Sequence, residues 1–595
     1  MNRVRQRVAC APAAVAVVAF YFWMVRAAGS KFEWGADLNG YYDFLGRGFA
    51  GGHLYLPVEP SPQLLAQPDP WDPKVDDSLK WQDMVLYHRH YYLYFGAAPA
   101  VLLFAPFRIL TRHDLPENFA IFLLCSVGFL FWVGSFLKLL RMAGAEPAPW
   151  LLGLMILALG IAQSVPYLLN RVAVYEIAIA GGYFCLAAGM YFLARRWLAA
   201  AGVAFATGVA CRPHLLFAGI VALVVLAIWN GRRVAVPFLV AFALVGLAIA
   251  AYNYERFDNP LEFGFRYQLA GPGQNRVEVA PRNFVPGLYY MLLSRPEWSP
   301  VFPWMRMVFR FPFDSAALHP LPPEYFVEPT VGALWITPFL LAAFWIPRNN
   351  AILWVAPVSA AAVLLFLMLS HLATHRYEVD FLALAVFAAI SNLAIRISRM
   401  GGVRRAIWSA AAACLIVYSV VANLALAIQG PYDDVLRNRP ARYLRIAKWF
   451  SPITETRPAE DPRISVNLSF QCSRDSMGMR EPLITMGHSH FHYFLFVEKT
   501  GNNLKLISKS DESDASYDLA DAWTRPVALR LDYSPESHQL TVELDGQAAI
   551  QQHISKLITA PADVEIGQNL SDLGLTARRF TGPLHLSEKT VVAGR

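Results

Sequence analysis

Apolar stretches long enough to cross a lipid bilayer recur along the first 430 residues, and they constrain the fold more than any other feature. A membrane helix needs roughly 20 apolar residues, because the hydrocarbon core is about 30 Å thick. The chain is therefore predicted to be a multi-span α-helical membrane protein with about eleven spans. The predicted spans are Val8–Val25, Phe119–Leu137, Trp150–Leu169, Val172–Leu193, Leu198–Cys211, Leu215–Trp229, Val234–Ala251, Val331–Ile346, Ala351–Leu369, Val379–Ile395 and Ile407–Ile428.

Two stretches decide the number of spans. Paired arginines precede and follow Trp197–Trp229, and positive charge favours the cytoplasmic side, so both ends of this stretch are predicted to be cytoplasmic. It is interpreted as a hairpin of two short spans, broken at Arg212-Pro213-His214, because proline ends the first helix. Ala97–Leu110 is roughly half the length of a span and is interpreted as an interfacial or re-entrant helix.

This count predicts a protein of the cell inner or plasma membrane, with a cytoplasmic N-terminus and an extracytoplasmic, periplasmic C-terminal domain. The net charge of +7 is attributed to arginines on the cytoplasmic side rather than to a nucleic-acid partner. The N-terminal apolar run ends in YFWMVR, which lacks the small residues of a signal cleavage site, so we expect a retained anchor. The six cysteines show neither a disulfide framework nor metal-type spacing.

Residues 1–430 are predicted to form the membrane domain, with a first outer loop at 29–118 and a second at 252–330. The first loop concentrates carboxylates and aromatic residues within Lys31–Thr111, although the protein is otherwise apolar. Ionised carboxylates are costly in hydrocarbon, so we expect this loop to lie in water. Carboxylates beside aromatic rings suit a sugar ligand, and the loop is interpreted as half of an active site. Its acids are Asp37, Asp43, Asp69, Asp72, Asp76, Asp77 and Asp83.

The chain changes character after a predicted linker at 431–463. From about residue 464 apolar and polar residues alternate, which is the period of β-strands and predicts a β-sandwich over 464–595. Strands are expected at SVNLSF, HYFLFVEK, LKLISKS, VALRLDY, LTVELDG and DVEIGQN. The ending, with Ile566-Gly567 and Phe580-Thr-Gly-Pro-Leu584, resembles the last strands of laminin-G and legume-lectin-like (concanavalin-A-like) jelly rolls. Such domains bind glycans or serve as packing modules, and both alternatives stay open.

Two polar clusters of this domain were considered as metal sites. His488, His490 and His492 would share one face of a strand, an arrangement that can bind a metal. No cysteine or nearby carboxylate completes a ligand set, so a solvated strand face is favoured. The acids of the stretch Asp511–Asp514 are interpreted as a solvated turn rather than a calcium site.

Three classes of function fit a membrane protein with acids and arginines on its outer face. Transporters tend to carry ionisable groups at mid-span and internal repeats, neither of which the sequence shows. An enzyme at the outer interface is therefore favoured. The alternatives are a non-enzymatic glycan-binding or export protein, and a transporter or flippase of lipid-linked sugars.

Motifs along the first 430 residues favour one family of enzymes. They are Asp37-Leu-Asn-Gly-Tyr41-Tyr42, Gly51-Gly-His-Leu-Tyr55, Tyr91-Tyr-Leu-Tyr-Phe-Gly96 followed by Pro99 and Pro106, and Arg376-Tyr377 with Asp380-Phe381. Their order and the predicted topology resemble the GT-C superfamily of glycosyltransferases, which includes protein mannosyltransferases, aminoarabinose transferases of lipid A and mycobacterial arabinosyltransferases. The chain departs from the commoner Asp-Glu pair, since Leu38 follows Asp37.

The resemblance implies transfer of a sugar from a polyprenyl-phosphate carrier to a glycan, lipid or protein acceptor outside the cytoplasm, with inversion. It suggests Asp37 as general base, acting alone or with Asp43 or Asp83, and Glu176 as an acceptor or metal contact. Arginine is suited to phosphate, which suggests Arg376 and Arg212 for the donor phosphate. Further substrate contacts are expected from Trp34, Tyr41, Tyr42, Tyr92, Tyr377, Asp380 and Glu262.

Structural roles compete with each of these assignments. Asp37 could cap a helix or pair with Arg47, and Glu176 could pair with Arg171. The two arginines and the aromatic residues could anchor the protein at the membrane interface. No metal ligand is assigned, and the sequence leaves open whether a divalent cation such as Mg or Mn takes part.

Overall fold

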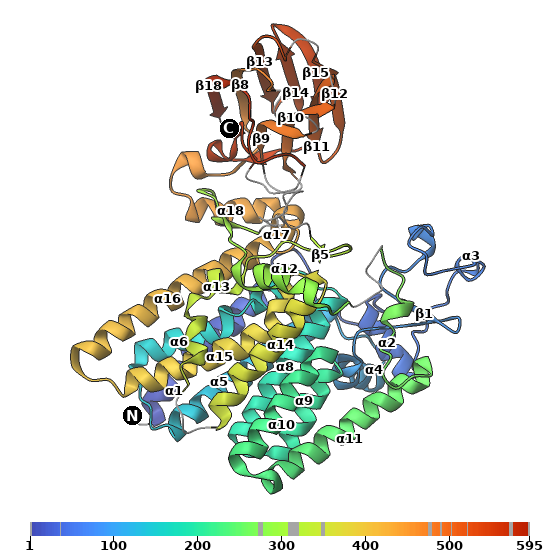
Figure 1. The fold of residues 1–595 in the computed structure, drawn as a ribbon, viewed down its shortest axis with the longest axis vertical. Helices are drawn as coiled ribbons and strands as arrows, with labels where there is room; N and C mark the ends of the chain where they lie inside the picture. Colours follow the sequence, from blue (N-terminus) through green and yellow to red (C-terminus); the bar gives the residue numbers. More distant parts are fainter. Residues whose placement is uncertain are drawn as a thin grey trace. The chain divides into compact units, whose positions relative to one another are not determined.

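The computed structural model describes residues 3–35, 37–271, 278–307, 321–346, 351–473, 479–487, 491–500, 503–519, 522–569 and 575–592. The chain forms two compact units (Figure 1). The helical unit combines Met1–Arg295 with Phe313–Ala427, and the sandwich unit combines Pro296–Pro312 with Ile428–Arg595.

The helical unit contains the membrane-length helices. Seven helices in the described part of the chain are long and apolar enough to cross a membrane. They are α5 (Glu117–Met142), α8 (Val174–Ala194), η3 with α10 (Pro213–Asn230), α11 (Arg232–Phe257), α14 (Ala351–Leu369), η8 with α15 (His375–Ser398) and α16 (Gly402–Gln429). Four shorter apolar helices lie in α1 (Arg3–Met24), in Ala100–Thr111, in α6 (Pro149–Ile161) and in α9 (Leu198–Val209). These helices agree with the prediction of a helical membrane protein.

Two predicted spans are broken in the structure. Within Trp150–Leu169, α6 ends at Ile161 and α7 (Val165–Asn170) begins after Ser164, whose φ of 59° interrupts the helix. Within Val331–Ile346, only Ala333–Ile336 is α-helical (α13), and Pro338–Phe344 forms a 3-10 helix (η7). A proline stands in the first turn of α7 and of η7. Its lack of an N–H has no cost there, because the first N–H groups of a helix have no acceptor within the helix.

The predicted break at Arg212-Pro213-His214 is present. Helix α9 ends at Val209, the 3-10 helix η3 covers Pro213–Leu215, and α10 (Leu216–Asn230) follows. The proline occupies the first position of η3, as its fixed φ favours. Arg212 therefore lies in the turn between two apolar helices.

The segment predicted as the first outer loop folds around a core of its own. Helix α2 (Tyr41–Ala50) packs against a π-helix, η2 (Ala100–Phe104), and the following α4 (Ala105–Thr111). Buried residues of α2 and η2 form one hydrophobic cluster with the start of α8, and the partly buried Phe107 of α4 packs against it. The remaining elements are α3 (Pro62–Leu65), η1 (Asp77–Leu79) and the paired strands β1 (Val85–Tyr87) and β2 (His90–Tyr92).

Short elements fill the chain between α11 and α15. They are η4 (Phe265–Tyr267), η5 (Pro281–Asn283), α12 (Phe284–Leu288), the π-helix η6 (Tyr289–Leu293), β5 (Phe326–Val327) and β6 (Leu372–Ala373). Strands β5 and β6 pair in parallel, which brings the segment before α13 against the segment before α15.

The sandwich unit contains two five-stranded antiparallel sheets with one shared hydrophobic core. One sheet has the order β12-β11-β10-β9-β17 and the other β15-β14-β13-β8-β18. The strands are β8 (Arg463–Phe470), β9 (Arg480–Met486), β10 (Tyr493–Thr500), β11 (Asn503–Ser510), β12 (Asp514–Asp518), β13 (Val527–Ser534), β14 (Gln539–Leu544), β15 (Gln547–His553), β17 (Glu565–Ile566) and β18 (Leu584–Val592).

The six strands expected from alternation are all present, as β8, β10, β11, β13, β14 and β17. The turn between β14 and β15 has φ of 49° at Asp545 and 80° at Gly546. Two successive residues with positive φ are typical of the tight hairpin turns that Asp-Gly favours. The closing strand begins at Leu584, four positions after Phe580.

The segment predicted as a linker, 431–463, carries secondary structure. It contains α17 (Asp434–Asn438), α18 (Pro440–Phe450), η9 (Thr454–Thr456) and β7 (Ala459–Glu460), which pairs with β16 (Ile558–Thr559). Part of the predicted second outer loop also joins the sandwich unit, as the hairpin β3 (Glu297–Trp298) and β4 (Met305–Arg306). Arg306 Nη2 bonds to Asp563 Oδ1 at 2.6 Å, beside η12 (Pro561–Asp563). A buried ion pair thus ties this hairpin to the sheets.

Candidate functional site

A buried arginine, Arg376, lies between two carboxylates of the helical unit. It belongs to η8 (His375–Tyr377), immediately before α15 (Glu378–Ser398). Its Nη1 donates to Glu176 Oε1 at 3.4 Å and its Nη2 to Glu328 Oε1 at 3.0 Å. Glu176 stands in the first turn of α8, whereas Glu328 directly follows β5. The structure therefore pairs Glu176 with Arg376, and adds an acid that the sequence had not indicated.

Glu328 reaches this position through the parallel pairing of β5 with β6. Val327 is opposite Ala373, so the next residue along each strand, Glu328 and Thr374, are neighbours. Thr374 Oγ1 donates to Glu328 Oε2 at 2.7 Å. A parallel bridge between two-residue strands leaves almost no periodic signal, so sequence reasoning could not have found this contact.

A second ion pair adjoins the first. Arg212 Nη2 donates to Asp380 Oδ2 at 3.0 Å, and His214 Nε2 lies 2.9 Å from the same oxygen. The guanidinium of Arg212 lies 4.4 Å from the centre of the Tyr377 ring, and that of Arg376 lies 6.0 Å from it. The ring of Tyr377 thus lies beside both arginines, a favourable arrangement because its face attracts cations. Arg212, Arg376, Tyr377 and Asp380, which the sequence had grouped as site residues, are brought together.

Asp83 is the fourth acid of the group. Its carboxylate accepts hydrogen bonds from the hydroxyl of Tyr175 and, at 2.7 Å, from Gln268 Nε2. The Tyr175 ring lies 4.5 Å from the Arg376 guanidinium, so one tyrosine contacts both the acid and the arginine. Burial raises the pKa of Asp83, although the Gln268 hydrogen bond and the charge of Arg376 lower it. We call Asp83, Glu176, Arg212, Glu328, Arg376 and Asp380 the polar cluster.

Several polar atoms of this cluster are buried with no hydrogen-bond partner among the described residues. They are Nε of Arg212 and of Arg376, Oε2 of Glu176 and Oδ1 of Asp380. Buried polar atoms in proteins are usually hydrogen-bonded. Unpaired donors and acceptors side by side can bind a ligand that carries both, such as a hydroxyl-rich phosphate ester.

Asp37 does not contact the polar cluster. Its side chain is 70% exposed and bonds to Arg108 Nη1 at 2.7 Å, the one hydrogen bond found for this carboxylate among the described residues. The hydrogen bond and charge of Arg108 lower the pKa of Asp37. Arg108 also contacts the buried Asp114, which forms an ion pair with Arg47. The expected alternative pairing of Asp37 with Arg47 is replaced by this network.

Asp43 has a structural position at the start of α2. Its Oδ2 accepts a hydrogen bond from the backbone N–H of Gly40, the N-cap residue, at 3.1 Å, and so satisfies a free donor at the start of the helix. Burial, followed by the nearby charges of Glu117 and Asp114, raises the pKa of Asp43 to about 8. Asp43 therefore stabilises the start of α2 rather than joining the polar cluster.

Tyr41 and Tyr42 differ in their surroundings. The hydroxyl of Tyr41 donates to the carbonyl of Gln82, next to Asp83, and burial with the Asp83 charge raises the pKa of Tyr41 to about 12. Tyr42 is fully buried and donates to the Gly96 carbonyl at 3.1 Å. Tyr41 therefore lies at the edge of the polar cluster, and Tyr42 belongs to the hydrophobic core.

The other predicted contacts lie elsewhere. Trp34 packs on Phe119 with ring centres 4.9 Å apart, and Tyr92 packs on Phe257 with ring centres 5.5 Å apart. Glu262 accepts a hydrogen bond at 2.7 Å from the backbone N–H two residues later and so stabilises its own turn. These three residues show structural contacts rather than contacts with the polar cluster.

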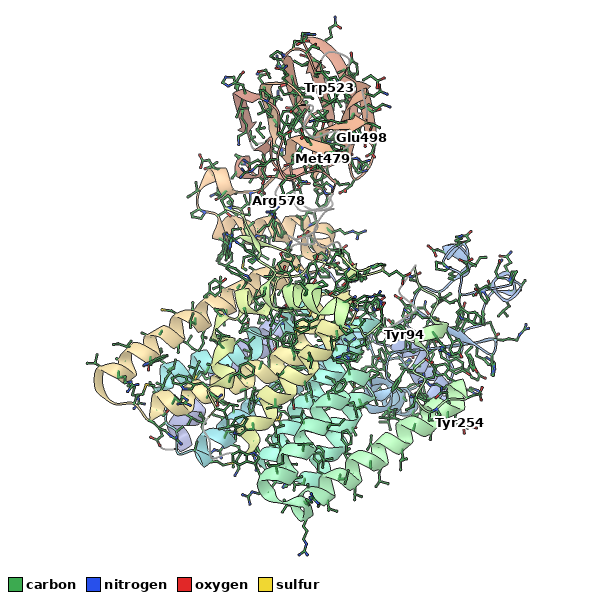
Figure 2. All side chains as sticks on the ribbon, in the orientation of Figure 1. Tyr94, Tyr254, Met479, Glu498, Trp523 and Arg578 are labelled. Atoms are coloured by element: carbon green, nitrogen blue, oxygen red, sulfur yellow. The ribbon has the colours of Figure 1, made fainter. Side chains whose placement is uncertain are left out.

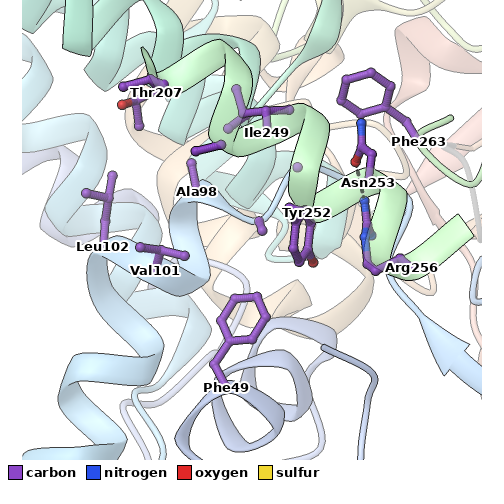
Figure 3. A pocket seen from close by; sticks show the side chains of 15 residues that line it. Phe49, Ala98, Val101, Leu102, Thr207, Ile249, Tyr252, Asn253, Arg256 and Phe263 are labelled. Carbon is purple, nitrogen blue, oxygen red and sulfur yellow. Dashed lines mark hydrogen bonds between the residues drawn. The ribbon is translucent and has the colours of Figure 1, made fainter. Parts of the chain in front are cut away.

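An apolar cavity of about 300 Å³ opens between α11 and the segment around η2 (Figure 3). At one end Arg256, only 3% exposed, donates to the Leu93 carbonyl and to Asn253 Oδ1, both at 2.8 Å. The cavity is lined by Phe49, Gly96, Ala97, Ala98, Val101, Leu102, Thr207, Ala210, Val245, Ala248, Ile249, Tyr252, Asn253, Arg256 and Phe263. We call it the apolar groove.

The chain from Leu93 to Ala98, which is irregular up to the helix that begins at Ala98, is shared by the groove and the polar cluster. Gly96 approaches Ala210 so closely that a Cβ would stand 1.7 Å from the carbonyl oxygen, so only glycine fits. Tyr94, labelled in Figure 2, lies near the polar cluster, since its pKa is raised well above its usual value by burial and by the Asp83 charge and is lowered by the charge of Arg376. The predicted motif Tyr91–Gly96 therefore connects the two features.

Metal binding finds no support in the described residues. No group of three or more His, Cys, Asp or Glu side chains there is arranged to hold an ion. His488 and His490 lie outside the described residues, and His492 Nε2 lies 3.4 Å from Asp511 Oδ1. Asp514 pairs with Lys509 at 2.8 Å, in keeping with a solvated turn.

Comparison with known proteins gives little guidance. No family model matches the chain, and no curated protein matches it. Two solved structures of the CBM40 of Ruminococcus gnavus IT-sialidase are similar to part of it. The form bound to α2,3 sialyllactose shares 16% identity over 23% of this chain and 76% of that chain, with a TM-score of 0.17. The form bound to α2,6 sialyllactose shares 15% identity over 23% and 77%, with a TM-score of 0.16.

Proposed function

We propose that the helical unit is a glycosyltransferase that takes a sugar from a polyprenyl-phosphate carrier and transfers it to an extracytoplasmic glycan, lipid or protein. One observation carries this proposal: Arg376 is buried between Glu176 and Glu328, next to the Arg212–Asp380 pair, and Nε of each arginine has no hydrogen-bond partner among the residues that the structure describes. Guanidinium groups bind phosphate through paired hydrogen bonds, and carboxylates accept protons from sugar hydroxyls.

In the proposed reaction the acceptor oxygen attacks the anomeric carbon from the face opposite the phosphate. A new C–O bond forms, the bond to the phosphate oxygen breaks, and its electron pair leaves with the polyprenyl phosphate. Arg376 and Arg212 would stabilise the charge that develops on the leaving phosphate. A carboxylate removes the acceptor proton, and attack from the opposite face inverts the anomeric centre, as in inverting glycosidases.

The geometry favours Asp83 over Asp37 as this base. A raised pKa makes the Asp83 carboxylate the stronger base, whereas Arg108 lowers the pKa of Asp37 and weakens it. Asp83 also shares Tyr175 with Arg376, so a base there acts next to the proposed phosphate site. Asp37 remains the assignment that the family resemblance implies.

The apolar groove supports a donor with a long hydrocarbon chain. Its wall includes the exposed side of α11, of which only 11% is buried, so the groove is bordered by a surface suited to lipid. The isoprenoid chain of the carrier would lie there, with the phosphate at the polar cluster across the chain from Leu93 to Ala98.

The proposal includes a topology of about eleven spans. These are the seven long helices, the four shorter apolar helices except Ala100–Thr111, and the broken segment 331–346. It also includes a glycan-holding role for the sandwich unit, as a jelly roll on the extracytoplasmic side of the inner or plasma membrane. Polar side chains on the exposed faces of β8 and β13 are compatible with sugar binding.

The test uses membranes that contain the full-length protein, incubated with polyprenyl-phosphate donors carrying different radiolabelled sugars. We expect release of polyprenyl phosphate from one donor, and a loss of at least about a hundredfold in Glu176→Gln and Arg376→Ala. Arg376→Lys should lose nearly as much, because lysine cannot form the forked contact. Binding of the donor without release of polyprenyl phosphate would favour the glycan-binding alternative. Full activity of Arg376→Lys would mean that Arg376 only anchors the protein at the membrane interface.

A further inference from the structure

Helix α18 (Pro440–Phe450) carries a concentration of positive charge that the proposed reaction does not use. Five basic residues and no acidic residue occur between positions 437 and 448 of the sequence. Aspartates precede them at 433 and 434, and the next acid is Glu455. The basic residues, all on the surface, are Arg437, Arg439, Arg442, Arg445 and Lys448.

One face of α18 is held within the sandwich unit. Tyr443 is buried and its hydroxyl donates to the Phe302 carbonyl at 2.8 Å, while the ring of Phe450 stacks on Phe302 at 5.7 Å. Ala447, one turn after Tyr443, is also buried. The hairpin β3–β4 therefore fixes which side of the helix remains on the surface.

The surface side combines cations with an aromatic residue. Arg442, Arg445 and Trp449 follow each other at intervals of three and four, so they lie on one face of the helix. Trp449 is 83% exposed, which is unusual for so large an apolar side chain. Cations interleaved with an exposed tryptophan are typical of helices that lie on anionic lipid surfaces, where the ring enters the headgroup layer.

The position of α18 in the chain favours a membrane as the partner. Helix α16, which is long and apolar enough to cross a bilayer, ends at Gln429. The chain from Gln429 to Pro440 covers eleven residue steps and can extend over roughly 39 Å at most, since each residue adds about 3.5 Å. The basic helix is thus tethered within reach of the membrane surface at which α16 ends.

We propose that the basic face of α18 binds the anionic lipid headgroups of the bilayer around α16. Through α18 this interaction anchors the sandwich unit at the membrane surface. The interaction does not depend on whether the protein transfers sugar. The attraction is electrostatic in part, so it falls with ionic strength and with the fraction of anionic lipid.

The test compares the full-length protein in nanodiscs of phosphatidylcholine with and without phosphatidylglycerol. Hydrogen exchange of the backbone amides from 440 to 453 should be several-fold slower in the anionic discs. A cysteine at Ala441→Cys, on the exposed side, should react more slowly there with a soluble maleimide. Peptide mass spectrometry separates this site from Cys414, which is also exposed.

Charge reversal gives the matched control. Arg445→Glu with Lys448→Glu should abolish the difference between the two lipid compositions. Lys505→Glu with Arg530→Glu, which changes the charge equally on exposed positions of β11 and β13, should preserve it. Equal protection in both kinds of disc would overturn the proposal. So would protection that requires an added acidic protein, because the partner would then be that protein.

Discussion

At the scale of single residues, Asp37 and Asp83 compete for the role of base. We expect Asp83→Asn to reduce transfer by about a hundredfold or more, because an amide cannot accept the acceptor proton. Asp37→Asn should stay within a few-fold of the native rate, since Arg108 already holds that exposed carboxylate. Activity should fall as the pH drops through the raised pKa of Asp83, where the base becomes protonated. Initial rates at saturating donor, with thermal unfolding as the folding control, decide between them. The opposite ranking would restore Asp37 as the base.

At the scale of elements, the chain from Leu93 to Ala98 depends on glycine. In Gly96→Ala the new Cβ would stand 1.7 Å from the Ala210 carbonyl oxygen, so α9 and this segment must move apart. We expect a loss of about 1–3 kcal/mol in the free energy of unfolding, the usual cost of overpacking. Gly246→Ala in α11 is the matched control, since no atom lies within 4 Å of its Cβ position. That change should be neutral or stabilise the helix by up to about 1 kcal/mol. Equal thermal stability of the two variants would mean that the close approach is unimportant.

The side of the membrane on which the C-terminus lies is a property of the whole molecule, and two features of the sequence bear on it in opposite directions. The predicted count places residues after α16 outside, whereas the basic residues between 437 and 448 favour the cytoplasm by their charge. We expect the residues after α16 to lie outside, as the predicted number of spans implies. A large folded domain follows the basic residues, and such domains cross the membrane largely regardless of charge. A fluorescent reporter that folds only in the cytoplasm should stay dark after Arg595 and be bright when inserted at Gly231, between α10 and α11. A bright signal at the C-terminus would mean that the sandwich unit lies in the cytoplasm, where it could not hold the proposed extracytoplasmic acceptor.

Features that depend on short-range periodicity could be predicted from the amino-acid sequence. Apolar runs of bilayer length indicated the membrane helices and alternation indicated six strands, because each signal lies within one element. The breaks at Ser164 and after Ile336 were missed, since apolar composition continues through them.

Which polar residues meet depends on the folded chain and could not be predicted from the sequence. Arg376 and Glu328 are 48 positions apart, and Asp83 and Gln268 are 185 apart, so no local pattern relates them. Glu176 and Arg376 were expected at one site from their family resemblance, but their partners depended on how β5 pairs with β6 and on how the first loop packs against α8. In the sequence Asp37 was preferred to Asp83 as the base, because Asp37 lies in the motif that resembles the family, although both are acids of one polar loop. Burial and the neighbouring Arg108 separate them, and both are properties of the folded chain.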